Sequence, residues 1–499
     1  MWRFFAADYN TAKDIIELYN LKKNMTEPHF QVFSGRNIGN EEIELIISGT
    51  GQVKAAMAAG YIMSGKSVEE RDILICIEPA GEQSEECTLC CEIHDEASGK
   101  YYYPDMCPVH PFDETSSCSG EFAAWYETLT CFAMQHQLVF ARIGKNAAQA
   151  LGEFLEGFYD VYEKRHPFHH VYVERCIKGD KTVQEVLGKL RHSRVVWINH
   201  YKDVFNRKKQ SLKLQKLSPA LILAKKTGQL VYPGSKECQS FGNSFFYYTS
   251  SMMNCLFDCE YCYLQGMYPS ADIVLFTNIE DIFAAVDELL ARHPVYLCIS
   301  YDTDMAALEA LTGYCRKWID YAVGRAGLTI ELRTKVDMPE QFVDYCREKV
   351  CENIIFAFTL TPDMVKLSYE HNTPSANVRI TAMERAAGNG LKVRACFDPL
   401  IIADCPGEDN RAAYSELIGQ LFDRMKPHEL YDVSLGEFRV PCDYLKRMRK
   451  KRPESKLLNY PFAKENESFC YGSEGQQLAD YVENVLLTYL PAEKIYRWR

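Results

Sequence analysis

The fold of this chain is decided by one stretch, Asn254-Cys255-Leu256-Phe257-Asp258-Cys259-Glu260-Tyr261-Cys262-Tyr263-Leu264. It places Cys255, Cys259 and Cys262 in the spacing C-x3-C-x2-C. Thiolates are the usual ligands of iron–sulfur clusters, so three of them this close predict a [4Fe–4S] cluster in which one iron lacks a protein ligand. An open coordination position is typical of catalytic rather than structural metal sites.

Two ordinary explanations compete with the cluster. The same spacing lines one face of a helix, so the cysteines could be core residues. The polar residues Asn254 and Asp258 within the stretch argue against a buried helix face. A zinc site usually has a fourth nearby ligand, and no second C-x2-C or histidine motif follows at zinc spacing. We therefore favour the cluster.

Length and composition limit the class of protein. The chain has 499 residues, of which 47% are hydrophobic, and this length predicts two or three compact units. No run of about 18 apolar residues and no secretory signal is visible, so we expect no membrane span. The 20 cysteines, in a chain without a signal, indicate reduced thiols and a cytoplasmic location.

Charge is uneven along the chain. The whole chain has a net charge of −12, but residues 161–250 hold 17 basic and 6 acidic residues. Such a segment could contact the phosphates of DNA, and a solvated, helix-rich linker explains it equally well.

The apolar pattern predicts an α/β protein. Near the N-terminus, strands at 44–48 and 73–77 flank a glycine turn and an Ala-rich helix at 52–63. Later strand-like runs alternate with helical patterns, which predicts repeated βα units and a barrel or partial barrel. These runs are Ile273–Phe276, Val295–Ile299, Leu328–Leu332, Ile354–Leu360, Val393–Phe397 and Tyr431–Leu435. We divide the chain into residues 1–165, a basic lead-in at 166–250, and the barrel with a C-terminal extension at 251–499.

The cysteine motif, with an aromatic residue before its last cysteine, resembles that of radical S-adenosylmethionine (SAM) enzymes. The resemblance implies that the cluster binds SAM at its open iron and, once reduced, cleaves it to a 5′-deoxyadenosyl radical. The continuation Cys259 to Gln265 is similar to the C-x-Y-C-Y-L-Q of spore photoproduct lyases, and this likeness extends from about Val171 to the C-terminus. It implies a partial (β/α)6 radical SAM barrel that repairs a thymine dimer in DNA.

The same resemblance implies roles for individual residues. Tyr261 would pack near the adenine of SAM, and Tyr263 would be a catalytic radical relay. Lys335 would pair with the SAM carboxylate, and Thr303 and Thr359 would contact SAM through their hydroxyls. From the residues alone, the tyrosines could equally be packing residues and Lys335 a surface lysine at a strand end.

One position departs from the lyase pattern. The family's hydrogen-donor cysteine would fall at Tyr301, in the run Cys298-Ile299-Ser300-Tyr301-Asp302-Thr303-Asp304. A phenol can donate a hydrogen atom, although its reach differs from that of a thiol. Cys298 is the nearest cysteine, but on a continuous strand its side chain would face away from that of residue 301. Cys396 is another candidate donor, from a neighbouring strand end. Either the donor role has moved, or the radical acts differently.

Residues 1–160 show a fainter resemblance. The turn Ser48-Gly49-Thr50-Gly51-Gln52 places backbone N–H groups where a strand enters a helix, which can hold an anion, although a plain tight turn is commoner. It resembles the G-x-G-x-x-x-A-A segment of nucleoside phosphorylases and methylthioadenosine nucleosidases. This implies an αβα domain that binds a nucleoside through Gly49, Gly51 and Glu121. The family's catalytic acid is missing, because Arg142 to Asn146 stand at its place.

We therefore expect a cytoplasmic radical SAM lyase with a [4Fe–4S] cluster and SAM as cofactors. Its partners would be DNA or a nucleoside substrate, and an external electron donor such as flavodoxin or ferredoxin. Two alternatives stay open: a radical SAM enzyme acting on a nucleoside or another small molecule, or a nucleoside- or redox-sensing binding protein with a structural cluster.

Overall fold

The computed structural model describes residues 1–81, 84–105, 114–158, 167–235, 238–403 and 409–498. The described chain divides into two compact units. Unit 1 comprises Met1–Arg175 and His192–Ala220, and unit 2 comprises Cys176–Arg191 and Leu221–Arg499. The domain boundary that the sequence predicts near residue 165 lies outside the described residues, so that division stays a prediction.

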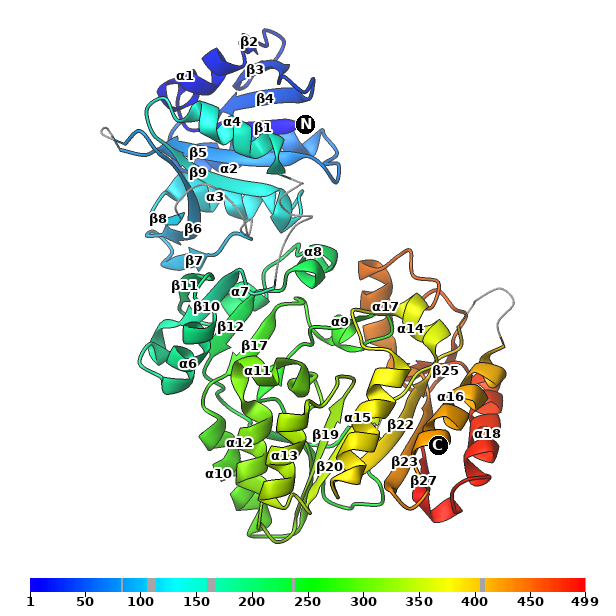
Figure 1. Ribbon diagram of the computed structural model, residues 1–499. Coiled ribbons are helices and arrows are strands. Elements are labelled where there is room, and N and C mark those ends of the chain that lie inside the picture. The colour runs from blue at the N-terminus through cyan, green and yellow to red at the C-terminus, as the bar shows by residue number, and fades with distance from the viewer. Residues whose placement is uncertain (82–83, 106–113, 159–166, 236–237, 404–408, 499) are drawn as a thin grey trace. The chain divides into compact units, whose positions relative to one another are not determined.

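Unit 1 contains a mixed sheet between two helical layers (Figure 1). Its strands run in the order β2-β3-β4-β1-β5-β9-β6-β7, with β8 paired to β6. One face of the sheet packs against α1 and α4, and the other against α2 and α3. The central strand β1 (Trp2–Ala6) is buried along its whole length because both of its faces are covered. The predicted αβα layering is confirmed.

The elements of the chain up to residue 220 follow in order. They are β1 Trp2–Ala6, α1 Tyr9–Leu18, β2 Lys22–Lys23, β3 Gln31–Arg36, β4 Glu42–Ile47, α2 Gln52–Ser64, β5 Ile73–Pro79, β6 Cys87–Asp95, β7 Lys100–Tyr102, β8 Glu114–Ser117, α3 Gly120–Leu129, η1 Gln135–Gln137, β9 Leu138–Ile143, α4 Ala148–Glu156, β10 His170–Glu174, η2 Arg175–Ile177, α6 Lys181–Lys189, β11 Arg194–Ile198, α7 Lys202–Phe205 and α8 Leu212–Leu217.

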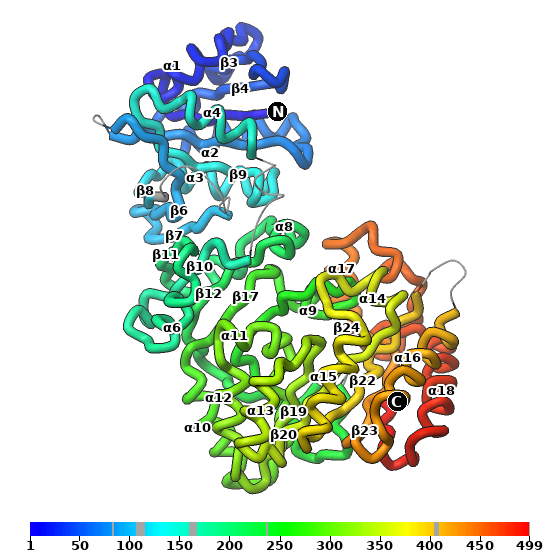
Figure 2. Tube along the Cα trace, viewed as in Figure 1, coloured from blue at the N-terminus to red at the C-terminus, as the bar shows by residue number. Residues whose placement is uncertain are grey.

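Unit 2 is built on an eight-stranded sheet in the order β13-β14-β18-β19-β20-β22-β23-β27. The strands from β14 to β23 are six parallel neighbours, and β27 continues the parallel pairing. Helices lie along the outside of this sheet, with α16 and α18 side by side (Figure 1 and Figure 2). The predicted partial (β/α)6 barrel is confirmed.

One predicted barrel strand belongs elsewhere. Residues Ile273–Phe276 form β17, but β17 pairs with β12 and β15 rather than with the barrel sheet. The place beside β18 is taken by β14, in the aromatic run Phe246–Thr249. Spacing along the chain identified the strand but not its neighbours, because pairing is decided by packing that spacing does not record.

The remaining elements run from residue 221 to the C-terminus. They are β12 Leu221–Ala224, β13 Val231–Pro233, β14 Phe246–Thr249, β15 Met252–Met253, β16 Asp258–Cys259, α9 Leu264–Met267, β17 Ile273–Phe276, α10 Ile279–Leu290, β18 Val295–Cys298, η3 Met305–Leu308, α11 Glu309–Thr312, α12 Tyr314–Ala322, β19 Leu328–Thr334, α13 Glu340–Lys349, β20 Ile354–Thr359, α14 Asp363–Tyr369, β21 Glu370–His371, α15 Ala376–Gly388, β22 Lys392–Leu400, α16 Asn410–Arg424, β23 Leu430–Glu437, β24 Arg439–Pro441, α17 Cys442–Lys451, β25 Ala463–Glu465, β26 Ser468–Cys470, α18 Ser473–Leu487, η4 Ala492–Lys494 and β27 Ile495–Arg497.

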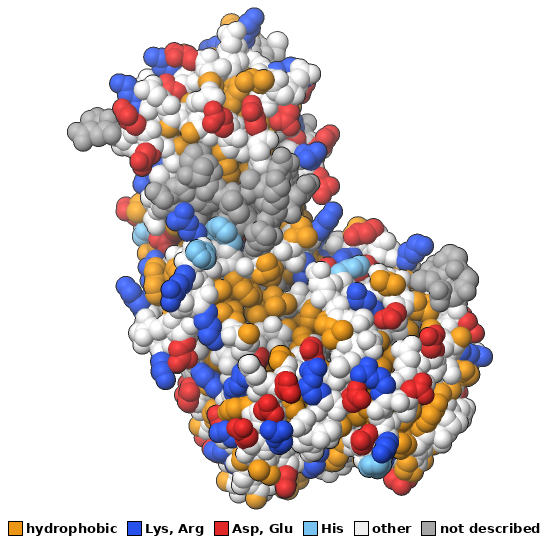
Figure 3. All heavy atoms as spheres, in the orientation of Figure 1, with side chains coloured by type: hydrophobic (Ala, Val, Ile, Leu, Met, Phe, Trp, Pro, Cys, Tyr) orange, Lys and Arg blue, Asp and Glu red, His pale blue; other side chains and the backbone are white. Residues whose placement is uncertain are grey.

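Two further features are the distribution of charge on the surface of unit 2 and the length of the helices. On the face of unit 2 seen in Figure 3, Lys and Arg side chains alternate with Asp and Glu rather than forming one basic area. Among the helices that the structure describes, none combines the length and the apolar character needed to cross a bilayer.

Candidate functional site

A cavity of about 360 Å³ lies at the carboxyl ends of the barrel strands. Its lining comes from the ends of β18, β19, β20 and β22 and from the cysteine loop before α9. Ligand sites of parallel α/β folds form at this edge, because the loops there converge. The predicted site residues that line it are Cys255, Cys259, Cys262, Tyr261, Tyr263, Cys298, Tyr301, Thr303, Lys335 and Thr359.

The cysteine loop is fixed at its start by Asn254. This residue has a φ of 67°, a left-handed conformation that asparagine tolerates better than most residues. Its buried side-chain amide donates to the carbonyl oxygens of Ser270 (2.9 Å) and Asp272 (2.8 Å). The backbone therefore turns at Asn254, and Cys255 follows at the mouth of the loop.

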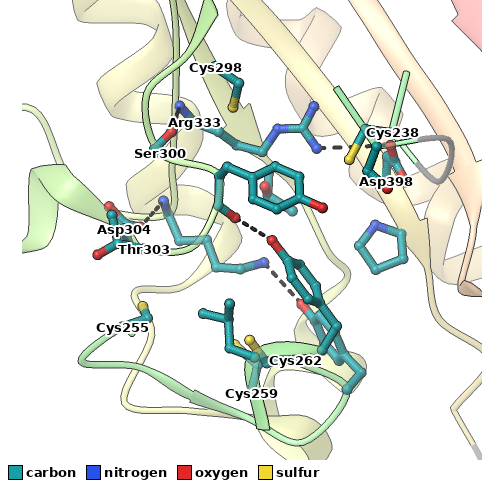
Figure 4. Close-up of a pocket in the computed structure, with 18 of the residues that line it drawn as sticks. Cys238, Cys255, Cys259, Cys262, Cys298, Ser300, Thr303, Asp304, Arg333 and Asp398 are labelled. Carbon is teal, nitrogen blue, oxygen red and sulfur yellow. Dashed lines mark hydrogen bonds and ion pairs between the residues drawn. The ribbon is translucent and has the colours of Figure 1, made fainter. Parts of the chain in front are cut away.

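The three cysteines occupy one end of the cavity (Figure 4). Cys259 sits in β16, which pairs antiparallel with β21, and the Cys262 N–H donates to the Cys259 carbonyl (3.0 Å). Cys262 and Cys255 both act electrostatically on the Cys259 thiol, and Figure 4 draws the three cysteines below the other labelled residues. Within the described ranges, no three His, Cys, Asp or Glu side chains are grouped for a single metal ion.

The loop is tied down by the residues that end α17. Lys451 Nζ donates to the carbonyl oxygens of Gln265 (2.9 Å) and Tyr268 (2.6 Å). Arg452 forms an ion pair with Asp258 and donates to the Gln265 side chain (2.8 Å). Lys451 and Arg452, at the basic end of α17, therefore hold the cysteine loop in place instead of pointing into solvent.

A buried charge network stands behind the loop. Glu370 is fully buried and pairs with Lys335 (3.0 Å) and with Arg379. The Tyr261 hydroxyl donates to the same carboxylate, and Lys335 Nζ lies 3.0 Å from that hydroxyl oxygen. The surrounding cations outweigh the effect of burial and hold the Glu370 pKa below its usual range. Tyr261 and Lys335 are thus brought together, as a shared site requires.

Thr303 and its neighbour Asp304 differ in whether their side chains have hydrogen-bond partners. Asp304 accepts hydrogen bonds from Thr334 Oγ1 and from the Lys335 N–H, both at 2.8 Å, and so fixes the end of β19. Thr303 is 7% exposed and lines the cavity, yet its Oγ1 has no hydrogen-bond partner within the described structure. A buried hydroxyl without a partner points to a ligand that is polar at this place.

Two tyrosines, Tyr263 and Tyr301, also line the cavity. The Tyr263 hydroxyl donates to the Tyr301 carbonyl, and the two ring centroids are 5.8 Å apart. Tyr301 stacks on Tyr248 with centroids 4.0 Å apart. Burial raises the pKa of Tyr263 well above its usual value, so its hydroxyl keeps its proton at neutral pH.

The expectation that Cys298 and residue 301 face opposite ways is wrong. Strand β18 ends at Cys298, and the following residues turn, so side-chain alternation does not continue to Tyr301. Both side chains line the cavity. Cys396 is fully buried in β22 and is not among the residues that line it.

Sequence reasoning missed several residues that line the cavity, among them Arg333, Asp398 and the cysteine Cys238. Cys238 is half-buried, lies between β13 and β14, and interacts electrostatically with Tyr301. Figure 4 places it beside Asp398, away from the three motif cysteines. No motif marks it, because a cysteine in an irregular segment carries no periodic signal.

In unit 1 the predicted glycine turn is present, and Gly51 has a φ of 100°. Glu121 Oε1 accepts a hydrogen bond from the Gly51 N–H at 2.7 Å. Two of the residues predicted to bind a nucleoside therefore contact each other directly, and Gly49 lies in the same turn. At the place of the missing catalytic acid, Arg142 pairs with Glu78 at 2.6 Å.

The basic segment is only partly available for phosphates. Arg207 is buried in unit 1, where it lies 3.6 Å from Asp105 and donates to the Tyr103 carbonyl. Lys226 donates to the Ser250 carbonyl, and burial lowers its pKa to about 8. Lys202, Lys208, Lys209, Lys213 and Lys225 are exposed.

A partial (β/α)6 barrel whose strand ends surround a C-x3-C-x2-C loop defines the radical SAM class of fold and site. Residues 239–484 match the family model described as spore photoproduct lyase, so unit 2 is spore photoproduct lyase-like. A curated spore photoproduct lyase from Geobacillus sp. (strain Y412MC61) is 23% identical over 209 residues. That match covers 41% of this chain and 59% of the relative, which is less than two thirds of its length.

Solved structures agree on the fold. A spore photoproduct lyase complexed with dinucleoside spore photoproduct has a TM-score of 0.56 at 19% identity, covering 67% of this chain and 99% of that chain. A mutant lyase with bound AdoMet and dinucleoside spore photoproduct gives 0.55 at 18% identity, with the same coverage. A 5′-methylthioadenosine/S-adenosylhomocysteine nucleosidase from Colwellia psychrerythraea covers 31% of this chain and 88% of that chain, at 11% identity, with a TM-score of only 0.22. A TM-score this low does not support a shared fold, so nucleoside binding by unit 1 stays a prediction.

Proposed function

We propose that unit 2 holds a [4Fe–4S] cluster on Cys255, Cys259 and Cys262 and, with SAM, repairs a thymine photolesion in DNA. The observation that carries the proposal is the position of the three thiols, at one end of a cavity formed by the barrel strand ends, in a chain segment that matches the lyase family. When bound, the cluster and SAM supply a 5′-deoxyadenosyl radical that removes one hydrogen atom from the substrate.

The side chains around the cavity fit these cofactors. Three thiolates suit three irons and leave the fourth open toward the cavity. The Thr303 hydroxyl lacks a partner in the described structure, and leaving such a group unsatisfied costs about 1–3 kcal/mol, which a polar ligand would recover. Lys335, 14% exposed, supplies a cation for a ligand carboxylate.

The residues of this chain would position the ligand and exclude water. Tyr261 is held by Glu370 and Lys335, so its ring forms a fixed wall beside the cysteine loop. Tyr263 and Tyr301 form the second wall and keep their protons, since burial raises the pKa of each phenol. Walls of this kind would keep water away from a reacting group in the cavity.

DNA as the substrate rests on the family, whose members include a lyase complexed with dinucleoside spore photoproduct. A lesion inside a duplex would have to leave the base stack to reach the cavity. The exposed lysines of the basic segment are candidate phosphate contacts. A nucleoside or another small molecule is the competing substrate.

The electron would come from an external donor such as flavodoxin or ferredoxin. All cysteines within the described ranges are free thiols, which fits a reducing compartment such as the cytoplasm.

The test starts with oxygen-free reconstitution of the full chain, with iron counted and SAM cleavage measured under dithionite. We expect about four irons per chain and 5′-deoxyadenosine as a product. Replacing all three motif cysteines with alanine is expected to abolish both. Dinucleoside spore photoproduct, a lesion-bearing duplex and free nucleosides are then compared as substrates. Wild-type protein that takes up no iron would refute the proposal, and turnover of free nucleosides alone would replace DNA as the substrate.

A further inference from the structure

Cys238 shares the cavity with the tyrosines of the site. It lines the same cavity as Tyr263, Tyr301 and Thr303, whose unpartnered hydroxyl marks the space as a ligand site. Tyr301, Arg333, Arg439 and Asp398 all act electrostatically on its thiol. Its backbone is held by a hydrogen bond from its N–H to the Ser235 carbonyl (3.1 Å).

The proposed reaction requires a hydrogen donor for the product radical, and Tyr301 alone is poorly suited to this role. Removal of a hydrogen atom and breakage of the lesion leave a carbon radical on the product, which must gain a hydrogen atom. An S–H bond is weaker than the C–H bond that forms, so a thiol beside the product completes this step readily. The chain has tyrosine where the family pattern has its donor cysteine, and the structure supplies a thiol from another segment next to that tyrosine.

On this basis, and resting on the proposed function, we infer that Cys238 donates the hydrogen atom that quenches the product radical, with Tyr301 restoring the thiol. One C–H bond forms as the Cys238 S–H bond breaks, leaving a thiyl radical. Tyr301 O–H returns a hydrogen atom to the sulfur and becomes a phenoxyl radical. Tyr263 supplies the hydrogen atom that Tyr301 lost. Tyr263 would regain its hydrogen atom from the 5′-deoxyadenosine that received one from the substrate; the 5′-deoxyadenosyl group left behind would rejoin methionine as SAM and return its electron to the cluster, so hydrogen atoms and electrons balance without an outside reductant.

Geometry favours Cys238 over the other cysteines considered. Cys396 does not line the cavity. Cys298 lines it but is only 7% exposed, and the charged groups acting on it are Glu331 and Arg333. Cys238 is half-buried, lines the cavity and interacts electrostatically with the Tyr301 phenol. It alone of the three combines access to the cavity with a neighbour that can return a hydrogen atom.

The first experiment does not depend on turnover. The full chain without its cluster is alkylated with iodoacetamide, with and without dinucleoside spore photoproduct, and each cysteine is quantified by peptide mass spectrometry. We expect the lesion to slow labelling of Cys238 by about tenfold, because bound substrate covers it. Cys442, a half-buried cysteine of α17 that does not line the cavity, is the internal control and should label at an unchanged rate. Equal labelling of Cys238 in both conditions, where the lesion is shown to bind, would overturn the inference.

The second experiment uses the reconstituted enzyme with a lesion deuterated at the abstracted position. In Cys238→Ala we expect deuterium transfer to 5′-deoxyadenosine to persist, while repaired product per 5′-deoxyadenosine falls by about tenfold or more, since only the quenching step has lost its group. Cys442→Ala should match the wild type in both quantities. Normal product yield in Cys238→Ala, or the same loss in Cys298→Ala alone, would contradict the assignment.

The two proposals fail in different ways. If wild-type protein transfers no deuterium from the lesion to 5′-deoxyadenosine, the proposed function fails. If transfer is normal and Cys238→Ala still gives full product, only the role of Cys238 fails. If Cys238→Ala does not fold, Cys238→Ser, which keeps the volume but holds its hydrogen more strongly, replaces it in the same measurement.

Discussion

Cys259 and Glu370 face each other across the two-residue ladder of β16 and β21. A proposed iron ligand is thus paired through its backbone with a carboxylate that is fully buried and held by Lys335 and Arg379. The ladder is a separate two-stranded sheet, and it ties the cysteine loop to the chain segment that connects β20 and β22. Changes in the barrel should therefore alter how the loop binds iron.

Asn254→Ala should weaken the cysteine loop without touching a thiol. The variant loses two buried amide hydrogen bonds and places alanine at a φ of 67°. We expect unit 2 to lose about 2–4 kcal/mol of stability, and the reconstituted protein to release iron faster. Hydrogen exchange of loop peptides and iron release to a chelator measure the two effects. Asn254→Gly tolerates the backbone conformation, so it should lose less stability, and equal losses would contradict this explanation.

Gly266→Ala should separate α9 from α17. A Cβ at Gly266 would lie 2.6 Å from the Tyr444 Cα and 2.7 Å from its carbonyl oxygen, so the backbones would have to move apart. Overpacking of this kind costs about 1–3 kcal/mol. Thermal unfolding measures the loss. Gly419→Ala in α16 is the matched control, because open space surrounds it, and it should be neutral or stabilising by about 0.5–1 kcal/mol.

Lys335→Met should reduce SAM binding. Removing the ammonium group deletes a charge-assisted contact worth about 1.5–3 kcal/mol, which corresponds to an increase in Kd of about tenfold or more. Equilibrium dialysis of SAM against the reconstituted protein measures it. Lys349→Met removes an exposed lysine that pairs with Asp320, and SAM affinity should not change in that variant. Unchanged SAM binding in Lys335→Met would exclude a direct contact.

Glu437 should make stability fall as pH rises. Burial and the nearby Glu465 raise the pKa of its carboxyl to about 6, and its Oε2 has no hydrogen-bond partner in the described structure. The folded chain therefore holds this proton more tightly than the unfolded chain does. Its stabilising effect is complete below the unfolded pKa of 4.5 and is lost as pH rises through about 6.

The test compares wild type with Glu437→Gln at about pH 5 and about pH 7.5, by hydrogen exchange of unit 2 peptides during urea unfolding. We expect the substitution to remove up to about 2 kcal/mol of pH dependence between these values. Glu416→Gln makes the same change of charge on the exposed side of α16 and should leave the pH dependence unaltered. A wild type whose stability rises over this interval would contradict the assignment.

Local patterns predicted much of the fold. The strands at Leu328, Ile354 and Val393 formed where apolar runs indicated, because buried parallel strands are apolar along their whole length. The partners of Ile273–Phe276 could not be predicted, because pairing is decided by distant segments.

The part of the site that contains a recognisable sequence motif could be predicted. Cys255 and its two partner cysteines have a spacing tied to one chemistry, and the structure places them at the cavity. Cys238 could not be found in this way, because its importance comes only from its contact with Tyr301 in space. The alternation expected from Cys298 to Tyr301 failed because the strand ends at the first of these residues.

The β16–β21 ladder and the Asn254 turn have a consequence for how the proposed cluster would be lost and replaced. Because the scaffold around Cys259 is held by backbone pairing and buried charges, emptying the site need not unravel the loop. Binding a new cluster to a cysteine loop that is already folded would require little further ordering of the chain. On the proposed function, protein that had lost its cluster to oxygen would therefore regain it when supplied with iron and sulfide.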